Sequence, residues 1–504
     1  MATSEPREVI DIPIIINGRC KYPSASDRLH QIDYENGLRV RIPAMGESDL
    51  EALKEERTAI TAALSSVSTD EITQFLNEAG DQWMARRSEG RRIADKYAHQ
   101  ITGFPPEMLT ADYETIGHFM VNRYHAYDQI AAEFGHERIF DEWIPNQMCY
   151  VRAFPRGLLL HYLVGNLPLA GMYSILRGIM SRNCSLAKLP SRDPLTVFAF
   201  AKAMIDVDPE HPVSRSLSIA YWPHGARIED ECLRSVDSVC IWGGAAAVET
   251  LKRKIPANVP VAEYGPKWSA SVIDLTRCDP EEAAYRLVED VSFYDQEACF
   301  STQRAFVLGP VEEFRSHLRK YFDHFAKRFP LVSGNRDALA HRSATLLQAR
   351  YSGLEVDQGE HWAVVVIKDG EAGSLPHPLT RTLFLHPVAS LSAVRSYLDQ
   401  HTQTISLLPW EIASEHRDEW ALAGANRLVE LGWSRLPRAG FTHDGTHGMH
   451  PLVRLVSQER PRNDFGKYYL RPGNRKDWQR PYFLGDRWWS DPWWFLAGRD
   501  AVTG

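Results

Sequence analysis

The stretch VDSVCIWGGAAAVETLKRKIPANVPVAE, residues 236–263, contains two apolar runs with a Gly-Gly pair and a helical segment between them. The runs VDSVCIW (236–242) and VPVAE (259–263) predict strands, and residues 244–254 predict a helix. A strand, a helix and a strand in this order indicate a βαβ unit on a parallel sheet. The stretch therefore predicts an α/β fold.

The same alternation continues on both sides of this unit. Upstream, the pattern predicts strand GLLLHYL (157–163), a helix from Pro168, a strand at 185–188, a helix at 194–206 and strand SLSIA (216–220). Downstream, it predicts strand SASVIDL (269–275), a helix near 280–290, strand 304–309, a helix at 311–328 and strand 363–367. Two α/β domains follow one another, and parallel sheets of this kind commonly bind a nucleotide.

The N-terminal part has a different pattern. Asn17-Gly18 follows an apolar run and predicts a β-hairpin. From Ser48 to about Gln100 the apolar residues recur at helical spacing, with Asp49 as the expected cap. A strand pair followed by several long helices is therefore expected before the first α/β domain.

Length and composition indicate an ordinary globular protein. The 504 residues suggest two or three folding units. The chain carries 57 basic and 65 acidic residues, a net charge of −8, which argues against nucleic acid or an anionic membrane surface as partner. Small molecules or proteins are the expected partners.

The cysteines and the apolar stretches predict a cytoplasmic protein. The seven cysteines are scattered and form no CxxC pair, so they indicate no disulfide framework. The N-terminus MATSEPREVIDIP lacks the apolar core of a signal peptide. The longest apolar stretch, 157–173, is interrupted by His161, Asn166 and Pro168 and falls short of the ~20 residues that span a bilayer. We expect no membrane anchor.

Two features could hold a nucleotide, although no GxGxxG fingerprint opens any predicted helix. Gly243 and Gly244 stand between a strand and a helix, where a phosphate could approach backbone N–H groups. An ordinary strand-to-helix turn would have the same sequence. Lys188 ends an apolar strand and could meet a ribose or a phosphate, or it could be a surface lysine.

Two polar residues could take part in catalysis. Asn166, in LVGNLPLAG before a predicted helix, could cap that helix or donate an N–H to an oxyanion. Glu263 ends strand VPVAE just before Gly265-Pro266, where parallel sheets place catalytic groups; a solvated carboxylate is the alternative.

Cys299, in SFYDQEACFSTQRAFV, lies between a predicted helix and a strand. A free cysteine is most often a small buried hydrophobic residue. As a nucleophile, Cys299 would be exposed in a cleft between domains with a lowered pKa. His443, His447 and His450, in HDGTHGMH, fit neither an HExxH helix nor a common zinc module, so no metal is expected.

Taken in order, these residues resemble the aldehyde dehydrogenase superfamily over about residues 13–455. The motifs are VGNLPLAG, LAKLPS, the Gly-Gly pair after VDSVCIW, AEYGPKWS and DQEACFSTQRAFV. The segments GNLPL, YDQEACFSTQ, GANRLVELG (424–432) and HDG (443–445) are most similar to the acyl-CoA reductases called LuxC.

The resemblance implies a role for each site residue. Cys299 would take an acyl group from a thioester, Asn166 and the Cys299 backbone N–H would hold the oxyanion, and Glu263 would be the general acid/base. Gly243 and Gly244 would lie near the cofactor, with Lys188 at the adenosine ribose.

The cofactor implied is NADPH. In many NAD-preferring relatives a glutamate stands three positions after the lysine, whereas here Ser191 occupies that position and Arg192 follows it. No carboxylate would repel a 2′-phosphate, and a cation is near. A family motif that contacts the nicotinamide ribose has TLFLHPV (382–388) as its nearest match, without a carboxylate, so no residue is assigned to that role.

The resemblance implies two Rossmann-like α/β domains and a β-hairpin for oligomerisation. The expected parts are 1–135 and 157–263 for nucleotide binding, 136–156 for a hairpin that forms a homo-oligomer, 264–455 for catalysis, and 456–504 as a Trp-rich extension. The extension contains Trp478, Trp488, Trp489, Trp493 and Trp494. It would cover the acyl entrance or an interface, or merely dock onto its own domain.

The leading hypothesis is an NADPH-dependent reductase that converts an acyl thioester, on coenzyme A or a carrier protein, to an aldehyde. An acyl-protein synthetase or a carrier protein is the implied partner. Two alternatives stay open: an NAD(P)-dependent aldehyde dehydrogenase that releases an acid, and a non-redox acyl-carrying or scaffold subunit.

Overall fold

The computed structural model describes residues 8–146, 149–331, 336–368 and 375–459. The chain divides into two compact units, one made of residues 1–137 and 155–453 and the other of 138–154 and 454–504. Both predicted α/β domains fall in the first unit. The five tryptophans of the expected C-terminal extension lie outside the described residues.

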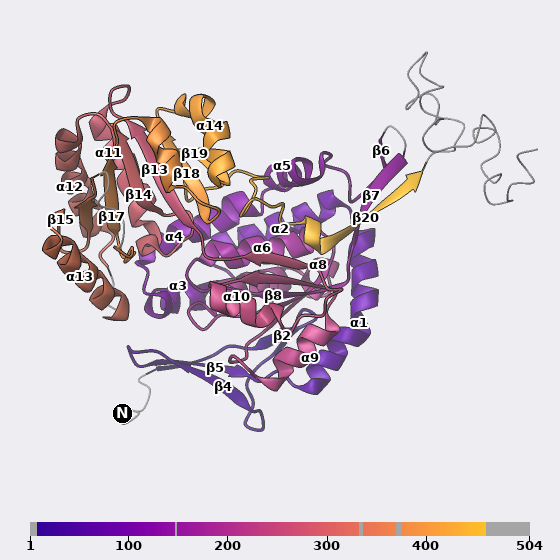
Figure 1. The fold of residues 1–504 in the computed structure, drawn as a ribbon. Helices are drawn as coiled ribbons and strands as arrows, with labels where there is room; N and C mark the ends of the chain where they lie inside the picture. The colour runs from indigo at the N-terminus through magenta and orange to yellow at the C-terminus, as the bar shows by residue number, and fades with distance from the viewer. Residues whose placement is uncertain (1–7, 147–148, 332–335, 369–374, 460–504) are drawn as a thin grey trace, which may run out of the picture. The chain divides into compact units, whose positions relative to one another are not determined.

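The first sheet of this unit has seven strands in the order β12-β11-β8-β9-β10-β2-β3. Its strands β2 and β8 are labelled in Figure 1. Strands β8 to β12 run parallel to one another, and α6, α7, α9 and α10 lie in the connections between them, whereas β2 pairs with β10 in the antiparallel direction. Both faces of this part of the sheet are covered, so β8, β9 and β10 are buried at every position. The bounds are β8 Leu158–Tyr162, α6 Pro168–Met180, β9 Cys184–Lys188, α7 Thr196–Val207, α8 Pro212–Arg215, β10 Leu217–Ala220, α9 Arg227–Ser235, β11 Ser238–Trp242, α10 Ala245–Lys252 and β12 Val261–Tyr264.

The predicted N-terminal hairpin is confirmed, and it extends the first sheet. Asn17 and Gly18 have φ values of 48° and 75°, and they join β2 to the antiparallel strand β3. Asp49 is not the helix cap, because Gly46 holds that position and donates its N–H to the Asp49 carboxylate at 2.8 Å. The elements are β1 Glu8–Asp11, β2 Ile14–Ile16, β3 Arg19–Lys21, β4 Leu29–Asp33, β5 Leu38–Pro43, α1 Glu47–Ser66, α2 Thr69–Met84, α3 Glu89–Thr102, α4 Pro106–Thr115, η1 Ile116–Met120 and α5 Arg123–Phe134. Strands β1, β5 and β4 form a separate sheet.

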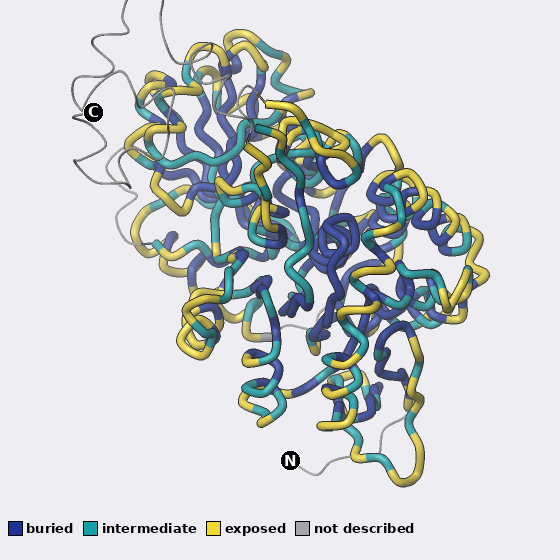
Figure 2. The backbone as a smooth tube through the Cα atoms, turned by 90° about the vertical axis from the view of Figure 1, so that its right-hand side faces the viewer, coloured by how far each residue is buried: buried dark blue, intermediate teal, exposed yellow. Residues whose placement is uncertain are grey.

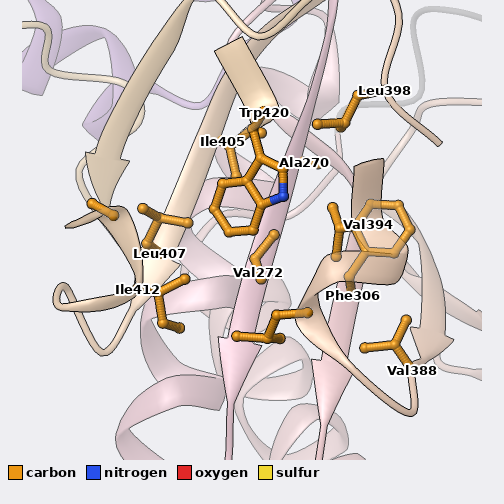
Figure 3. Close-up of a cluster of buried hydrophobic side chains, with 12 residues drawn as sticks. Ala270, Val272, Phe306, Val388, Val394, Leu398, Ile405, Leu407, Ile412 and Trp420 are labelled. Atoms are coloured by element: carbon orange, nitrogen blue, oxygen red, sulfur yellow. The ribbon is translucent and has the colours of Figure 1, made fainter. Parts of the chain in front are cut away.

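The second large sheet has the order β15-β16-β17-β14-β13-β18-β19 and is parallel except at β15. Alternation along β13 and β18 places apolar side chains on one face, where Trp420 of α14 packs with Val272 and Ile405 (Figure 3). The bounds are β13 Trp268–Asp274, α11 Pro280–Ser292, η2 Phe293–Gln296, β14 Thr302–Leu308, α12 Val311–Arg328, α13 Arg336–Tyr351, β15 Glu355–Gln358, β16 Ala363–Val366, β17 Thr382–Pro387, η3 Leu391–Tyr397, β18 Thr402–Leu408, α14 Ile412–Ala423, β19 Arg427–Glu430 and η4 His450–Leu452.

Burial follows this architecture. In Figure 2 the buried segments run through the interior of the chain path, and the exposed segments lie mostly on loops and outer helices. None of the helices among the described residues is both long enough and apolar enough to cross a bilayer.

The second unit contains a three-stranded sheet with the order β20-β7-β6. β6 (Ile144–Pro145) and β7 (Cys149–Pro155) are antiparallel, and β20 spans Val453–Glu459. This antiparallel pair falls within the predicted 136–156 hairpin. Its role in oligomerisation stays a prediction.

Candidate active site

A cavity of about 630 Å³ lies within the first unit at the carboxyl ends of β8, β9, β11 and β12. The segment that carries Cys299 lines it as well. Seven of the eight predicted site residues line this cavity, namely Asn166, Lys188, Ser191, Arg192, Gly243, Gly244 and Cys299. Glu263 is the one that does not. Carboxyl ends of parallel strands are where ligands bind in open α/β sheets.

The segment before Cys299 has an unusual backbone. Tyr294, Asp295 and Gln296 have φ values of 55°, 52° and 65°, in the left-handed region that residues other than glycine rarely adopt. Tyr294 is fully buried, and its hydroxyl donates to Asp112 at 2.6 Å. Strained backbone of this kind persists only where the surrounding structure holds it, and it clusters at functional sites.

Two side chains of this segment bind to the residues at the start of β17. Asp295 forms an ion pair with Arg381 at 2.7 Å, and the Arg381 side chain is 1% exposed. The Gln296 amide donates to the carbonyls of Thr302 and Thr382 at 2.8 Å, and its oxygen accepts the Thr382 N–H at 2.7 Å. The backbone leading to Cys299 is therefore held in place before any ligand binds.

Cys299 is half-buried, and its surroundings oppose the charged form of its thiol. Burial, and then the Asp444 carboxylate, raise the pKa of Cys299 to about 12, although a hydrogen bond from Gln403 and the charge of Arg427 act in the opposite direction. The lowered pKa expected from the sequence is therefore wrong for this structure. The thiol is neutral at pH 7 and must lose its proton to react.

Asn166 points to the Cys299 segment rather than capping a helix. Leu167 is the cap residue of α6, and the Asn166 side-chain N–H donates to the Glu297 carbonyl at 2.8 Å. An amide nitrogen carries two N–H groups, so one remains for an oxygen in the cavity. The Asn166 carbonyl oxygen is buried and has no hydrogen-bond partner among the described residues.

Glu263 lies at the end of β12, as predicted, but it is exposed. Its carboxylate forms an ion pair with Lys252 of α10 at 2.6 Å, and its side chain is 42% exposed. The structure thus shows the solvated carboxylate that the sequence left open, at the end of the edge strand β12. Its acid/base role stays a prediction.

Lys188 and Gly244 define the part of the cavity that could hold a nucleotide. Lys188 is 7% exposed, so it is not a surface lysine, and its ammonium lies over the Tyr221 ring, 5.8 Å from the ring centroid. Burial lowers the pKa of Lys188, although the charge of Glu229 opposes this. Gly244 begins α10, and a Cβ placed there would meet no atom within 4 Å. The helix N-terminus is open to a ligand.

Ser191 and Arg192 are both exposed on the loop after β9. The Ser191 carbonyl accepts a hydrogen bond from Tyr34 at 2.6 Å. Arg192 forms an ion pair with Glu297 at 2.8 Å. The predicted phosphate-binding arginine thus connects the nucleotide loop to the segment that carries Cys299.

The sequence reasoning missed an aromatic cluster that lines the cavity. Trp242 stacks on Tyr264 with ring centroids 4.1 Å apart, and His443 meets their edges at 5.0 and 4.8 Å. Burial lowers the pKa of His443 to about 3, so its imidazole is neutral. In the sequence, the HDG segment (443–445), which contains His443, was the only sign of this cluster.

His447 and His450 stack on each other, and His450 Nε2 lies 2.8 Å from the Glu133 carbonyl oxygen. Within the described ranges, no three His, Cys, Asp or Glu side chains gather as metal ligands would.

Comparison with known proteins identifies the family. The profile of the family described as acyl-CoA reductase (LuxC) matches residues 64–457. The chain is 35% identical over 458 residues to a long-chain acyl-protein thioester reductase of Vibrio harveyi, covering 90% of this chain and 94% of that protein. It is also 35% identical over 455 residues to the protein of the same name from Photorhabdus luminescens, covering 89% and 93%.

The solved structures with a similar fold include aldehyde dehydrogenases. An aldehyde dehydrogenase from Brucella melitensis biovar abortus matches with a TM-score of 0.70 at 12% identity, covering 89% of this chain and 97% of that chain. An NADP-dependent glyceraldehyde-3-phosphate dehydrogenase from Bacillus halodurans matches with a TM-score of 0.67 at 14% identity, covering 89% and 99%. The chain is therefore an oxidoreductase that belongs to the acyl-CoA reductase (LuxC) family and has the aldehyde dehydrogenase fold.

Proposed function

We propose that this enzyme reduces a long-chain acyl thioester, held on a carrier protein or on coenzyme A, to the aldehyde with NADPH. The relatives at 35% identity are named long-chain acyl-protein thioester reductases. The observation that carries the proposal is that one cavity joins the Cys299 thiol, the Asn166 amide, the buried Lys188 and the open N-terminus of α10.

In the first step the Cys299 sulfur attacks the thioester carbonyl. The new Cys299 C–S bond forms as the bond to the carrier sulfur breaks, and the carrier leaves as a thiol after taking up a proton. Thioester exchange is nearly balanced in free energy, so a thiol is suited to accept the acyl group. The second N–H of Asn166 and the Cys299 backbone N–H would hold the carbonyl oxygen as negative charge develops there.

The part of the cavity near Lys188 and Gly244 fits the phosphate groups of a dinucleotide. Gly244 leaves room for a phosphate at the start of α10, and Lys188 brings a buried cation. Ser191 offers no carboxylate against a 2′-phosphate, and Arg192 could reach one on leaving Glu297. Bound NADPH would supply the hydride that reduces the acyl group on Cys299.

The position of Glu263 favours the aldehyde over the acid as product. Release of an acid would need a base to activate water against the acyl group on Cys299. Glu263 is paired with Lys252 and does not line the cavity, so it does not activate a water where it lies here.

Partners and assembly follow from this proposal. A carrier protein or an acyl-protein synthetase would deliver the acyl group. We assign residues 1–135 and 157–263 to nucleotide binding and 264–455 to catalysis, with 136–156 as the contact of a homo-oligomer. Light scattering of the full chain and of a variant lacking the β6–β7 pair tests that assembly.

The direction of the reaction is tested by supplying each substrate in turn. With a long-chain acyl-CoA or acyl-carrier protein and NADPH, the enzyme should consume NADPH and release one aldehyde per NADPH. Faster reduction of NADP⁺ by a long-chain aldehyde, with release of an acid, would favour an aldehyde dehydrogenase. Absence of nicotinamide binding by calorimetry would favour a non-redox subunit.

A further inference from the structure

The strand β18 contains an irregularity beside Cys299. Trp268 of β13 pairs with Thr402, but Ala270 pairs with Ile405, so β18 has one residue more than β13 in this interval. Such a bulge redirects side chains and is frequent next to active sites. Regular alternation would place Gln403 with Ile405 on the apolar face, whereas the extra residue turns it to the face of Ser269.

Ser269 holds the two sides of this irregularity together. Its hydroxyl donates to the Cys299 carbonyl at 2.7 Å and accepts the Thr404 N–H at 3.2 Å. The hydroxyl thus satisfies a backbone N–H that the bulge removes from the regular ladder. The bulge and the Cys299 backbone are therefore fixed relative to each other.

The redirected Gln403 side chain reaches the sulfur. Gln403 is 3% exposed, and its Nε2 lies 3.1 Å from the Cys299 Sγ and 3.1 Å from the Asp444 Oδ1. Its Oε1 accepts the Thr404 hydroxyl at 3.2 Å. These contacts use both N–H groups and set the orientation of the amide, because an interchange of nitrogen and oxygen would face Asp444 with an acceptor.

We propose that Gln403 is a catalytic residue whose side-chain N–H stabilises the Cys299 sulfur when that sulfur carries negative charge, and that Asp444 positions the Gln403 amide. The proposal rests on the proposed role of Cys299 as the acyl acceptor. A hydrogen bond to a charged group is about twice as strong as one between neutral groups, so the Gln403 contact strengthens as the charge appears.

The sulfur carries this charge twice in one turnover. The thiol first gives its proton to solvent, and the sulfur attacks as a thiolate. The hydrogen bond from the Gln403 N–H to the sulfur then weakens while the S–C bond forms. After the acyl carbon has received a hydride, the oxyanion of the thiohemiacetal forms the aldehyde C=O, and the S–C electron pair returns to sulfur. The same N–H would stabilise this leaving thiolate before it takes up a proton.

Asp444 orients the Gln403 amide, but its negative charge destabilises the thiolate form of Cys299. The charged groups that face Cys299 are Asp444, which disfavours the thiolate, and Arg427 of β19, which favours it. Burial raises the pKa of Asp444, and the charges of Lys267 and Glu263 act on that pKa in opposite directions, Lys267 lowering it and Glu263 raising it. Gln403 and Asp444 thus influence the same sulfur in opposite directions, which a purely structural role would not produce.

The test is the pH profile of Cys299 alkylation by iodoacetamide in the full chain, with peptide mass spectrometry to follow Cys299 separately from the other cysteines. Gln403→Met keeps the length of the side chain but loses the N–H. It should shift the profile to higher pH by about one unit, which makes alkylation about tenfold slower at any fixed pH below the pKa. Asp444→Asn keeps an acceptor for Gln403 and removes the charge, so it should shift the profile to lower pH.

Gln303→Met is the matched control, because Gln303 is the extra residue of β14 between Thr302 and Arg304, the partners of Ser269 and Ala270, and lines the same cavity. Its alkylation profile should match that of the unaltered chain. The proposal is overturned if Gln403→Met leaves the profile in place, or if Asp444→Asn shifts it to higher pH. If Gln403→Met does not fold, the Asp444→Asn profile is the test: a shift to lower pH supports the proposal, and a shift to higher pH overturns it.

This assay needs neither acyl substrate nor nicotinamide. Opposite shifts without any aldehyde formation would therefore reject the proposed function but not the role of Gln403 toward the thiol. Aldehyde formation without the shifts would reject only the role of Gln403.

Discussion

The two sides of the cavity differ in how firmly their residues are held. On the sulfur side, Gln296, Arg381 and Gln403 are almost fully buried and are hydrogen-bonded. On the nucleotide side, Ser191, Arg192 and Gly244 are exposed. The nucleophile is thus positioned before substrate arrives, which limits the cost of ordering it during reaction. The nucleotide side keeps an open surface that a large ligand can enter.

Glu297 connects these two sides. Its backbone carbonyl accepts the Asn166 amide, and its carboxylate pairs with Arg192. Burial raises the pKa of Glu297, although the charge of Arg192 opposes this. Substitutions on the sulfur side should change stability or turnover, whereas substitutions on the nucleotide side should change the binding of the cofactor.

The largest effect, a loss of stability, is expected for the buried ion pair on the sulfur side. Arg381→Met leaves Asp295 buried without its partner, and breaking a buried pair in this way costs about 3–5 kcal/mol in the free energy of unfolding. Urea denaturation measures it. Arg253→Met is the control, because its pair with Glu249 is exposed and is worth about 0–1 kcal/mol. Equal losses for the two variants would show that the sulfur side is not specially anchored.

Asn166→Ala should impair chemistry more than binding. Loss of one donor to a developing oxyanion costs about 100- to 1000-fold in kcat. Steady-state kinetics with a long-chain acyl-CoA measures this loss, and calorimetry should give an unchanged Kd for NADPH. A variant with normal kcat would remove Asn166 from the oxyanion site.

Arg192→Ala should act mainly on the binding of NADPH. If Arg192 leaves Glu297 to meet a 2′-phosphate, its loss should weaken NADPH binding by about 1.5 kcal/mol, the lower end for a hydrogen bond to a charged group. NADH binding should not change. Equal weakening of both cofactors, or a kcat/KM for NADH that matches NADPH in the unaltered enzyme, would contradict this assignment of the loop.

Glu263→Gln should give the smallest effect. Because Glu263 is exposed and paired with Lys252, its loss should change turnover by less than about threefold, the scale of a surface ion pair. The pH profile of turnover should keep its shape, and NADPH binding should remain. A loss above about tenfold would show that Glu263 moves into the cavity and has the acid/base role predicted from the sequence.

The sequence predicted the regular parts of the fold well, because buried parallel strands appear as short apolar runs. GLLLHYL and VDSVCIW became β8 and β11 within two residues of the predicted ends. The Asn17-Gly18 turn was predictable because the pair adopts the positive φ values that such a hairpin needs. Asn166 could be placed near the site, but its choice between a cap and a donor required the structure.

The remaining features depend on packing that a linear pattern does not contain. Nothing in VPVAE indicates that Glu263 pairs with Lys252 of α10. The bulge that turns Gln403 toward Cys299 arises from the register between two strands far apart in sequence. The raised pKa of Cys299 comes first from its burial and then from Asp444, which lies 145 positions later in the chain. These are the features that give the sulfur side its chemistry.

The measurement that tests the account most directly is the mass of the intact enzyme after incubation with a long-chain acyl-CoA and no nicotinamide. The account predicts the addition of one acyl group, located on the Cys299 peptide, and its release as aldehyde when NADPH is added. Cys299→Ala should show neither step but should still bind NADPH, whereas Cys240→Ala should show both. Aldehyde formation by Cys299→Ala, or an acyl group on another cysteine, would contradict the central claim.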